Sequence, residues 1–345
     1  MKKILCIALC LSMLLPMTAC TGDGQKTIKV FNWGDYINES VLTEFTRQTG
    51  INVIYDTFNT NEDMYTKVKL SSGGSYDVVI PSDYMISKMI NEDMLVPLNR
   101  DNIPNFSLIN DRFKNLEFDP GNVYSVPYMW GTLGIVYNTT MVDDPVISYD
   151  ILWNKKYDGQ IFMMDSSRDS IGIALLRLGY STNTLDDAQL EEAKLSLIEQ
   201  KPLVLAYTGD EVKDKMVSGE AALAVVYSGD AMTICELNED IAYAIPEAGT
   251  NLWFDNMCIL KTTKCQSEAE QFINFMCSTE IAGLNRDAIL YATPQKEVFD
   301  SLPDEVKNDP LQYPGVEYQA RCYVYKDSPE INEKYNRIWD YIIMK

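Results

Sequence analysis

The chain has 345 residues, of which 46% are hydrophobic, and a formal net charge of −21 at pH 7. This length suits about two domains, and the apolar content supports a large core and excludes bulk disorder. The negative charge disfavours nucleic acid as a partner, and the absence of histidine excludes Ser-His-Asp systems, Cys-His systems and histidine-based zinc sites.

The N-terminus has the pattern of a targeting segment. Lys2 and Lys3 precede an apolar run over 4–16 that is too short to span a bilayer. The following Met17-Thr18-Ala19-Cys20 is similar to the lipobox of bacterial lipoproteins, whose signal is cut before a cysteine that receives lipid. This resemblance implies a signal peptide over 1–19, a lipid on Cys20 and a tether over 20–26. Free secretion after ordinary cleavage is the alternative.

The N-terminal third alternates strands and helices. The sequence predicts strands over 27–30, 51–55 and 76–80, and helices over 38–50, 61–70 and 83–91. Ser82 and Asp83 offer an N-cap for the third helix. Such alternation indicates an α/β fold whose largely parallel sheet is covered by helices on both faces.

The longest apolar-aromatic run covers 123–138 and contains Gly131 and Gly134. We expect a strand that crosses between two lobes, with the glycines easing a bend. A strand over 251–260 is expected to cross back. Between and after them the sequence predicts strands over 161–164, 203–206 and 222–226, and helices over 149–154, 168–178, 186–200, 231–237, 268–276, 280–285 and 331–343.

Five cysteines follow the predicted lipid site, namely Cys235, Cys258, Cys265, Cys277 and Cys322. Their number is odd and no CxxC occurs, which argues against a full disulfide framework and against a zinc knuckle. We expect mostly buried, reduced thiols, although a single bridge stays open. No metal site and no cofactor site is predicted.

Aromatic and acidic residues recur together at the ends of predicted strands. Trp33, Asp35 and Tyr36 follow the first strand, and the carboxyl ends of strands form the edge where α/β sheets bind ligands. Ring faces and carboxylates both attract ammonium groups. Similar clusters occur later, at Ser82-Asp83-Tyr84, Asp165 to Asp169, Tyr227 to Asp230, Trp253-Phe254-Asp255 and Tyr291. Together they predict one aromatic, acid-lined cleft.

Other interpretations of these clusters stay open. Each aromatic could be a core residue and each acid a helix cap, and Trp130 and Trp153 are expected to be packing residues. Asp165 with Asp169, or Asp255 with either, could be the acid and base of a glycosidase. A sugar or another small organic cation could also occupy such a cleft. No phosphate-binding loop motif occurs.

Six motifs carry a family likeness: 32–36, 76–82, 126–131, 176–181, 253–255 and 291–294. Together they closely resemble the spermidine/putrescine-binding proteins of bacterial polyamine ABC transporters, in order from about Thr27 to the C-terminus. The resemblance implies a monomeric, non-enzymatic binding protein that sits outside the cytoplasm on a lipid anchor. It would pass a polyamine to an ABC permease and ATPase complex.

The same resemblance implies a two-lobed periplasmic-binding-protein-like α/β fold. Each lobe would be a mixed, mostly parallel sheet with helices on both faces, and the lobes would close on a ligand between them. We expect lobe 1 to comprise 27–135 plus about 255–300, and lobe 2 to comprise 136–254 plus about 301–345.

The family's ligand-binding positions fall on identifiable residues of this chain. Asp255 stands at the family's central acid, and Asp169 stands where the family uses a glutamate against a terminal amine. Tyr227 stands where members often have tryptophan. The expected ligand-binding set is Trp33, Asp35, Tyr36, Ser82, Tyr84, Asp169, Tyr227, Trp253, Asp255 and Tyr291.

The chain departs from the family pattern in three places. Ser166 occupies a position where a spermidine binder of the family carries an aspartate, and Asp169 is one methylene shorter than glutamate. Both changes favour putrescine over spermidine, with Asp165 or Asp35 as possible substitutes for the lost acid. A late glutamine of the family has no clear match, and the region near Tyr325 lies nearest to it.

Overall fold

The structure, a computed structural model, describes residues 26–71 and 74–344. The predicted signal peptide over 1–19, the predicted lipid site Cys20 and nearly all of the tether therefore lie outside the described residues. Within the described ranges, no helix has both the length and the apolar character needed to cross a membrane.

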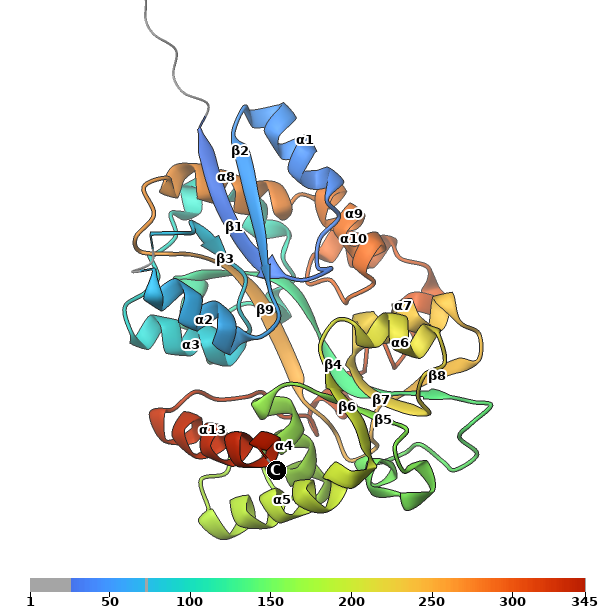
Figure 1. The fold of residues 1–345 in the computed structure, drawn as a ribbon. Coiled ribbons are helices and arrows are strands. Elements are labelled where there is room, and N and C mark those ends of the chain that lie inside the picture. The colour runs from blue at the N-terminus through green and yellow to red at the C-terminus, as the bar shows by residue number, and fades with distance from the viewer. Residues whose placement is uncertain (1–25, 72–73, 345) are drawn as a thin grey trace, which may run out of the picture.

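The first half of the molecule is built on five strand segments. Their order is β2-β1-β3-β9-β4, in which β1 is parallel to β2 and β3, and β9 is antiparallel to β3 and β4. The strands are β1 (Thr27–Trp33), β2 (Asn52–Phe58), β3 (Val78–Val79), β9 (Leu252–Ile259) and the start of β4 (Ser125–Asn138). The helices around them in Figure 1 are α1 (Ser40–Thr49), α2 (Asn61–Leu70), α3 (Asp83–Asn91), α8 (Gln266–Met276), α9 (Thr279–Ile289) and α10 (Lys296–Ser301).

The second half continues the same hydrogen-bonded path from the end of β4 through β7, β5 and β6, while β8 pairs with β4. Here β5 is parallel to β6 and β7. The strands are β5 (Ile161–Met164), β6 (Val204–Thr208), β7 (Leu223–Tyr227) and β8 (Ile241–Ala244). The helices are α4 (Ser167–Arg177), α5 (Asp187–Gln200), α6 (Val212–Val217), α7 (Ser228–Leu237) and α13 (Pro329–Met344). The short helices α11 (Asp304–Lys307) and α12 (Val316–Gln319) lie in the chain between α10 and α13, and Val306 of α11 packs against the apolar core of the first half.

Strand β4 joins the two halves. It pairs with β9 up to Thr132 and with β7 from Leu133 onward, which confirms the predicted crossing strand. The predicted bend at its two glycines stays a prediction, but both glycines have a steric role. A Cβ at Gly131 would collide with the Trp253 ring, and one at Gly134 would collide with Tyr243. The glycines therefore make room for aromatic rings of neighbouring strands.

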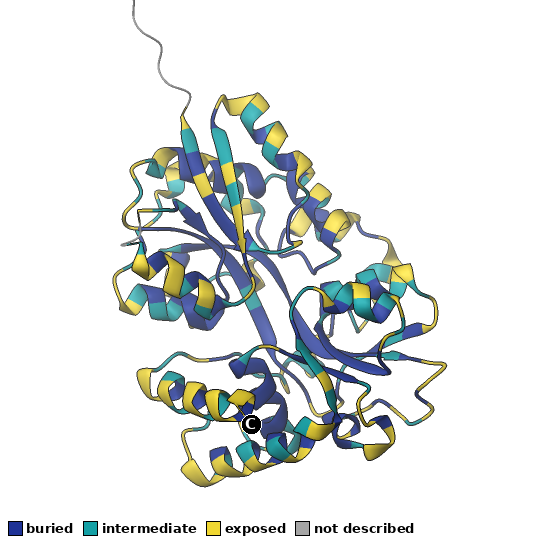
Figure 2. Ribbon diagram, viewed as in Figure 1, coloured by how far each residue is buried: buried dark blue, intermediate teal, exposed yellow. Residues whose placement is uncertain are grey.

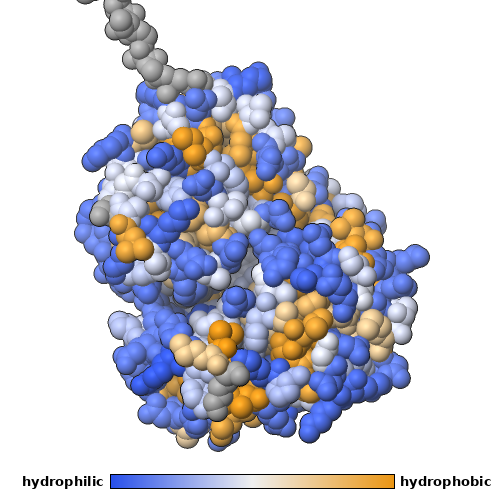
Figure 3. Space-filling view, viewed as in Figure 1, coloured by the Kyte–Doolittle hydropathy of each residue, from blue (hydrophilic) through white to orange (hydrophobic). Residues whose placement is uncertain are grey.

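Two main apolar cores lie on either side of the crossing, and Figure 2 shows buried residues along both halves of the sheet. The first core contains Leu252, Leu302 and Tyr313, whereas the second contains Ile331 and Ile342. This packing favours lobe boundaries near residue 251 and between residues 313 and 331. The predicted boundaries, near residues 254 and 300, differ from these and stay predictions. On the outside, Figure 3 shows a mostly hydrophilic surface, as expected for so acidic a chain.

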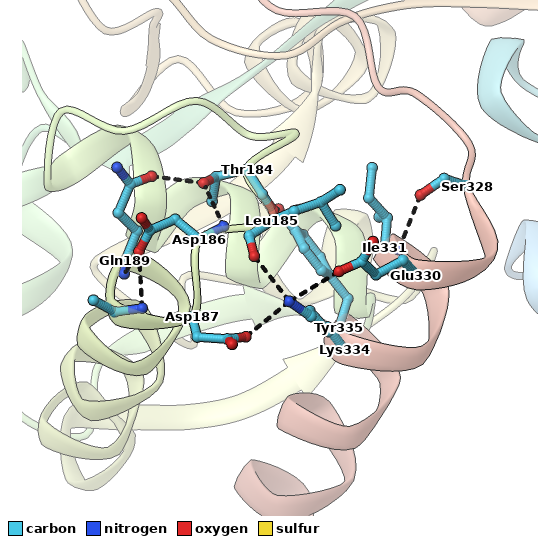
Figure 4. A network of polar contacts seen from close by, with 11 residues as sticks. Thr184, Leu185, Asp186, Asp187, Gln189, Ser328, Glu330, Ile331, Lys334 and Tyr335 are labelled. Atoms are coloured by element: carbon cyan, nitrogen blue, oxygen red, sulfur yellow. Dashed lines mark hydrogen bonds and ion pairs between the residues drawn. The ribbon is translucent and has the colours of Figure 1, made fainter.

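The C-terminal helix α13 is attached to the second half by apolar and polar contacts. Tyr335 is fully buried and donates a hydrogen bond to the carbonyl of Thr182 over 2.9 Å. Figure 4 shows Lys334 between Asp187 at 2.8 Å, Glu330 at 3.1 Å and the carbonyl of Leu185 at 2.8 Å. Exposed ion pairs contribute little, so the buried face of α13 carries most of the attachment.

All five cysteines in the part of the chain that the structure describes are free. The prediction that most are buried is wrong, because only Cys258 and Cys277 are buried and the other three are half-buried. Burial raises the pKa of the Cys277 thiol to about 12, so this thiol is not a reactive nucleophile.

Candidate ligand-binding site

A cavity of about 250 Å³ lies between the two halves. Its wall comes from the turns that follow β1, β2 and β3 in the first half and β5, β6 and β7 in the second, together with β9. These turns stand at the carboxyl ends of parallel strands, where α/β sheets bind ligands. Figure 3 shows the surface hollowed between the two halves, with mainly hydrophilic residues around the opening.

The structure brings nine of the ten predicted binding residues into the wall of this cavity: Trp33, Tyr36, Ser82, Tyr84, Asp169, Tyr227, Trp253, Asp255 and Tyr291. The tenth, Asp35, lies outside the lining. Its side chain is 74% exposed and forms an ion pair of 3.2 Å with Lys213 on α6. Trp130 and Trp153 are buried in the two cores, as predicted.

Asp169 lies in the first turn of α4 and is surrounded by hydroxyl groups. Ser166 is the N-cap of this helix and donates to the Asp169 carboxylate over 2.6 Å. The hydroxyls of Tyr227 and Tyr325 donate to the same carboxylate over 2.8 and 3.2 Å. Burial raises the pKa of Asp169, and these three hydrogen bonds partly offset the increase.

Asp255 lies on β9, where its side chain contributes to the cavity wall, and is 5% exposed. Burial raises its pKa to about 7, although interactions with Ser82 and Tyr36 act in the opposite direction. Among the described residues, its Oδ1 atom has no hydrogen-bond partner. Because buried polar atoms are normally hydrogen-bonded, this oxygen favours a donor supplied by a ligand.

A third buried acid, Asp83, serves the fold. Its Oδ1 accepts from the backbone N–H of Tyr84 over 2.7 Å, and its Oδ2 accepts from that of Phe254 over 3.0 Å. Burial raises its pKa to about 8. The first bond lies within α3, and the second ties the start of α3 to β9. Ser82 occupies the predicted N-cap position, but its side chain does not cap α3.

Aromatic rings connect the two acids along the cavity wall. Tyr227 contacts Trp253 with ring centroids 5.8 Å apart, and Trp253 contacts Tyr291 at 5.4 Å. Tyr291 in turn contacts Tyr36 at 5.0 Å, and all three pairs are edge-to-face. Trp33 is held by a 2.9 Å hydrogen bond from its indole N–H to the carbonyl of Ile80. Such a wall suits methylene groups and attracts cations at ring faces.

Among the wall residues outside the predicted set, Arg168 and Tyr325 act on Asp169 or on its partners, and only the region near Tyr325 had been named from the family pattern. Arg168 is 2% exposed, and its guanidinium lies 5.2 Å from the ring of Tyr84, 4.8 Å from that of Tyr325 and 4.9 Å from that of Tyr335. It therefore helps to hold Tyr325, one of the two tyrosines that donate to Asp169. The only sequence signal for this role was an arginine directly before an acid in an otherwise acidic cluster.

The arrangement offers two buried carboxylates, hydroxyl donors and a run of rings. It suits a small organic cation with an apolar middle, because acids pair with ammonium groups and rings cover methylenes. Within 26–71 and 74–344, no group of three or more cysteines and acids is placed to hold a metal ion.

The fold and the cavity define a solute-binding protein that holds its ligand between two halves. A model of the family "Bacterial extracellular solute-binding protein" matches residues 40–314. The chain belongs to this family. It is similar to the spermidine/putrescine-binding periplasmic protein of Escherichia coli, with 35% identity over 304 residues that cover 88% of this chain and 87% of the relative.

Solved structures agree with this assignment. The chain is similar to a putative spermidine/putrescine ABC transporter from Listeria monocytogenes, with 41% identity and a TM-score of 0.89 over 92% of this chain and 99% of the other. It is also similar to the spermidine/putrescine ABC transporter substrate-binding protein PotD from Streptococcus pneumoniae, with 44% identity and a TM-score of 0.79 over the same shares. These matches confirm the predicted periplasmic-binding-protein fold.

Membership in this family makes the chain an extracytoplasmic solute-binding protein and not an enzyme. The glycosidase alternative is therefore set aside.

Proposed function

We propose that this protein binds a polyamine, putrescine or spermidine, in the cavity and delivers it to an ABC importer. Relatives named as spermidine/putrescine-binding or putrescine-binding periplasmic proteins support this function at 30–35% identity. The ligand's two ammonium groups pair with Asp169 and Asp255. Its methylene groups lie against the rings of Tyr227, Trp253 and Tyr291.

The observation that carries this proposal is the unpartnered Oδ1 of the buried Asp255. An ammonium group supplies both the missing donor and the charge that stabilises the ionised carboxylate. A neutral sugar supplies only the donor, so it leaves the carboxylate with a raised pKa. The geometry therefore favours an organic cation over the sugar alternative.

Selectivity for ligand length follows from the two acids. A diamine of the wrong length leaves one buried carboxylate or one ammonium unpaired, and losing one partner of a buried ion pair costs about 3–5 kcal/mol. Ser166 supports putrescine as the preferred ligand, because its hydroxyl caps α4 and bonds Asp169 without adding a charge.

Calorimetric titration tests the function. The protein without residues 1–20 is titrated with putrescine, cadaverine, spermidine and spermine at physiological salt. We expect one-to-one binding, tightest for putrescine. No heat with any of them, from a protein that melts cooperatively, would contradict the proposal and favour another small organic cation or a sugar.

The protein is further proposed to be a monomer held at the membrane by a lipid on Cys20. The lipobox-like segment supports this anchor, as does a structural relative, the TpPotD lipoprotein of Treponema pallidum, which is 25% identical with a TM-score of 0.81. Cells grown with a labelled fatty acid should label the wild-type protein but not Cys20→Ala. Labelling of both would contradict the anchor.

A further inference from the structure

A cluster of three acids surrounds one lysine where the two halves meet. Lys213, on α6 of the second half, lies 3.2 Å from Asp35 and 3.3 Å from Asp230. Asp210 lies in the turn before α6, and its negative charge also acts on Lys213. Asp35 belongs to the turn after β1 in the first half. The Lys213 ammonium therefore bridges the two halves.

A glycine permits this close approach. A Cβ at Gly34 would collide with the Asp210 carboxylate, so the turn after β1 packs directly on the turn after β6. The contact closes one end of the cavity, which Gly34, Asp210 and Asp230 all line.

Asp230 differs from Asp169 and Asp255 in having an ammonium partner within the protein. The side chains of Asp230 and Lys213 are each only 14% exposed, so their ion pair is largely buried, and Lys213 also pairs with the exposed Asp35. Asp230 also lies beside Tyr291, the ring that continues from Trp253 along the wall. By contrast, Asp169 accepts from hydroxyls, and Asp255 retains an unpartnered oxygen among the described residues.

We propose that Lys213 is a specificity-determining residue whose ammonium group neutralises Asp230 at one end of the cavity. A ligand then brings ammonium groups to Asp169 and Asp255 only. A diamine satisfies both acids, whereas a triamine places a third positive charge beside Lys213, at an acid that is already paired. The inference rests on the proposed polyamine binding and adds a reason why this chain selects the shorter ligand.

The test compares putrescine and spermidine on Lys213→Met, a neutral side chain of similar reach. We expect the ratio of spermidine affinity to putrescine affinity to rise at least tenfold over wild type. Lys215→Met is the matched control, because Lys215 lies on the same helix and pairs with the exposed Glu220. The control should leave the ratio unchanged.

Two results would overturn the inference. One is a ratio within twofold of wild type in Lys213→Met. The other is an equal loss of affinity for both ligands, which would make Lys213 a latch between the halves without a role in selectivity. If the wild-type protein binds neither polyamine, the proposed function fails, and this result is distinct from both.

A second variant covers the case in which Lys213→Met does not fold because Asp230 loses its partner. Asp230→Asn keeps the Lys213 charge but removes its buried acid. We expect this variant to weaken spermidine binding at least fivefold more than putrescine binding. Equal weakening of both ligands would contradict the proposal.

Discussion

The surroundings of Asp169 and Asp255 differ, although both are buried carboxylates of one cavity. Asp169 accepts from Ser166, Tyr227 and Tyr325, so the protein itself orients and partly satisfies its oxygens. Asp255 has an oxygen without a partner among the described residues, and its pKa is raised to about 7. The protein thus already hydrogen-bonds the Asp169 carboxylate, whereas Asp255 depends on a ligand ammonium group to stabilise its charged form. The two positions should respond differently to mutation and pH.

The largest effect is expected for Asp255→Asn. The amide has the shape of the carboxylate but leaves a buried ammonium unpaired, which costs about 3 kcal/mol or more. Calorimetry should therefore show at least a hundredfold weaker polyamine binding. The melting temperature of the unliganded variant should stay equal or rise, because a costly buried charge is removed. Affinity within tenfold of wild type would contradict the assigned role of Asp255.

The pH dependence of binding should report the same residue. The pKa of Asp255 is raised to about 7, whereas amines like those of the ligand stay protonated up to about pH 10. Binding needs the carboxylate, so affinity should fall roughly tenfold per pH unit below pH 7. Titrations at pH 6 in two buffers of different ionisation enthalpy should show one proton released per ligand. Flat affinity between pH 5 and 7 would contradict this expectation.

Without ligand, the pH dependence of folding stability has the opposite sign to the pH dependence of binding. The raised pKa means that the folded protein binds this proton more tightly than the unfolded chain, whose aspartates titrate near about pH 4. The corresponding stability is fully present below about pH 4 and is lost as the pH rises through about 7. The increase in melting temperature caused by polyamine should therefore shrink as the pH is lowered from 8 to 5.

A smaller effect is expected from mutating Asp169, whose oxygens already accept hydrogen bonds within the protein. Asp169→Asn should weaken binding about tenfold, or ~1.4 kcal/mol, because the hydroxyl oxygens of Ser166, Tyr227 and Tyr325 remain to accept from the ammonium group. Tyr227→Phe and Tyr325→Phe remove one donor each and should cost two- to fivefold, or ~0.4–1 kcal/mol. If Asp169→Asn weakens binding as much as Asp255→Asn does, the distinction between the two acids is wrong.

Many of the helices and strands were predictable because the spacing of apolar residues and the helix-capping residues specify them locally. Helix α2 has the predicted bounds, and β1 extends the predicted strand from residue 30 to Trp33. Strand β8 and helix α6 were not predicted. Both are short, with four and six residues, and their formation depends on pairing with β4 and on packing against α7.

The cavity wall was largely predictable because strand ends gather at one edge of the sheet. Asp35 shows where this reasoning stops. Its φ of 45° places it in a left-handed turn after β1, so the alternation of the strand does not continue through it. The contribution of Tyr325 depends on a segment that follows 156 residues after Asp169, and no local pattern encodes such a contact.

Another small effect is expected from adding a charge beside Asp169, with Ser166→Asp. Aspartate also caps helices, so the start of α4 should remain intact, and a second carboxylate would stand beside Asp169. One more acid at this end should attract an additional ammonium group. We expect spermidine affinity to rise about fivefold relative to putrescine affinity, or ~1 kcal/mol.

Ser166→Ala is the control, because it removes the hydroxyl without adding charge and should weaken the binding of both ligands alike. A relative gain for spermidine in Ser166→Asp, but none in Ser166→Ala, would show that charge and not the lost cap sets the preference at this end. No gain would leave Lys213, at the opposite end of the cavity, as the residue that decides between the two ligands.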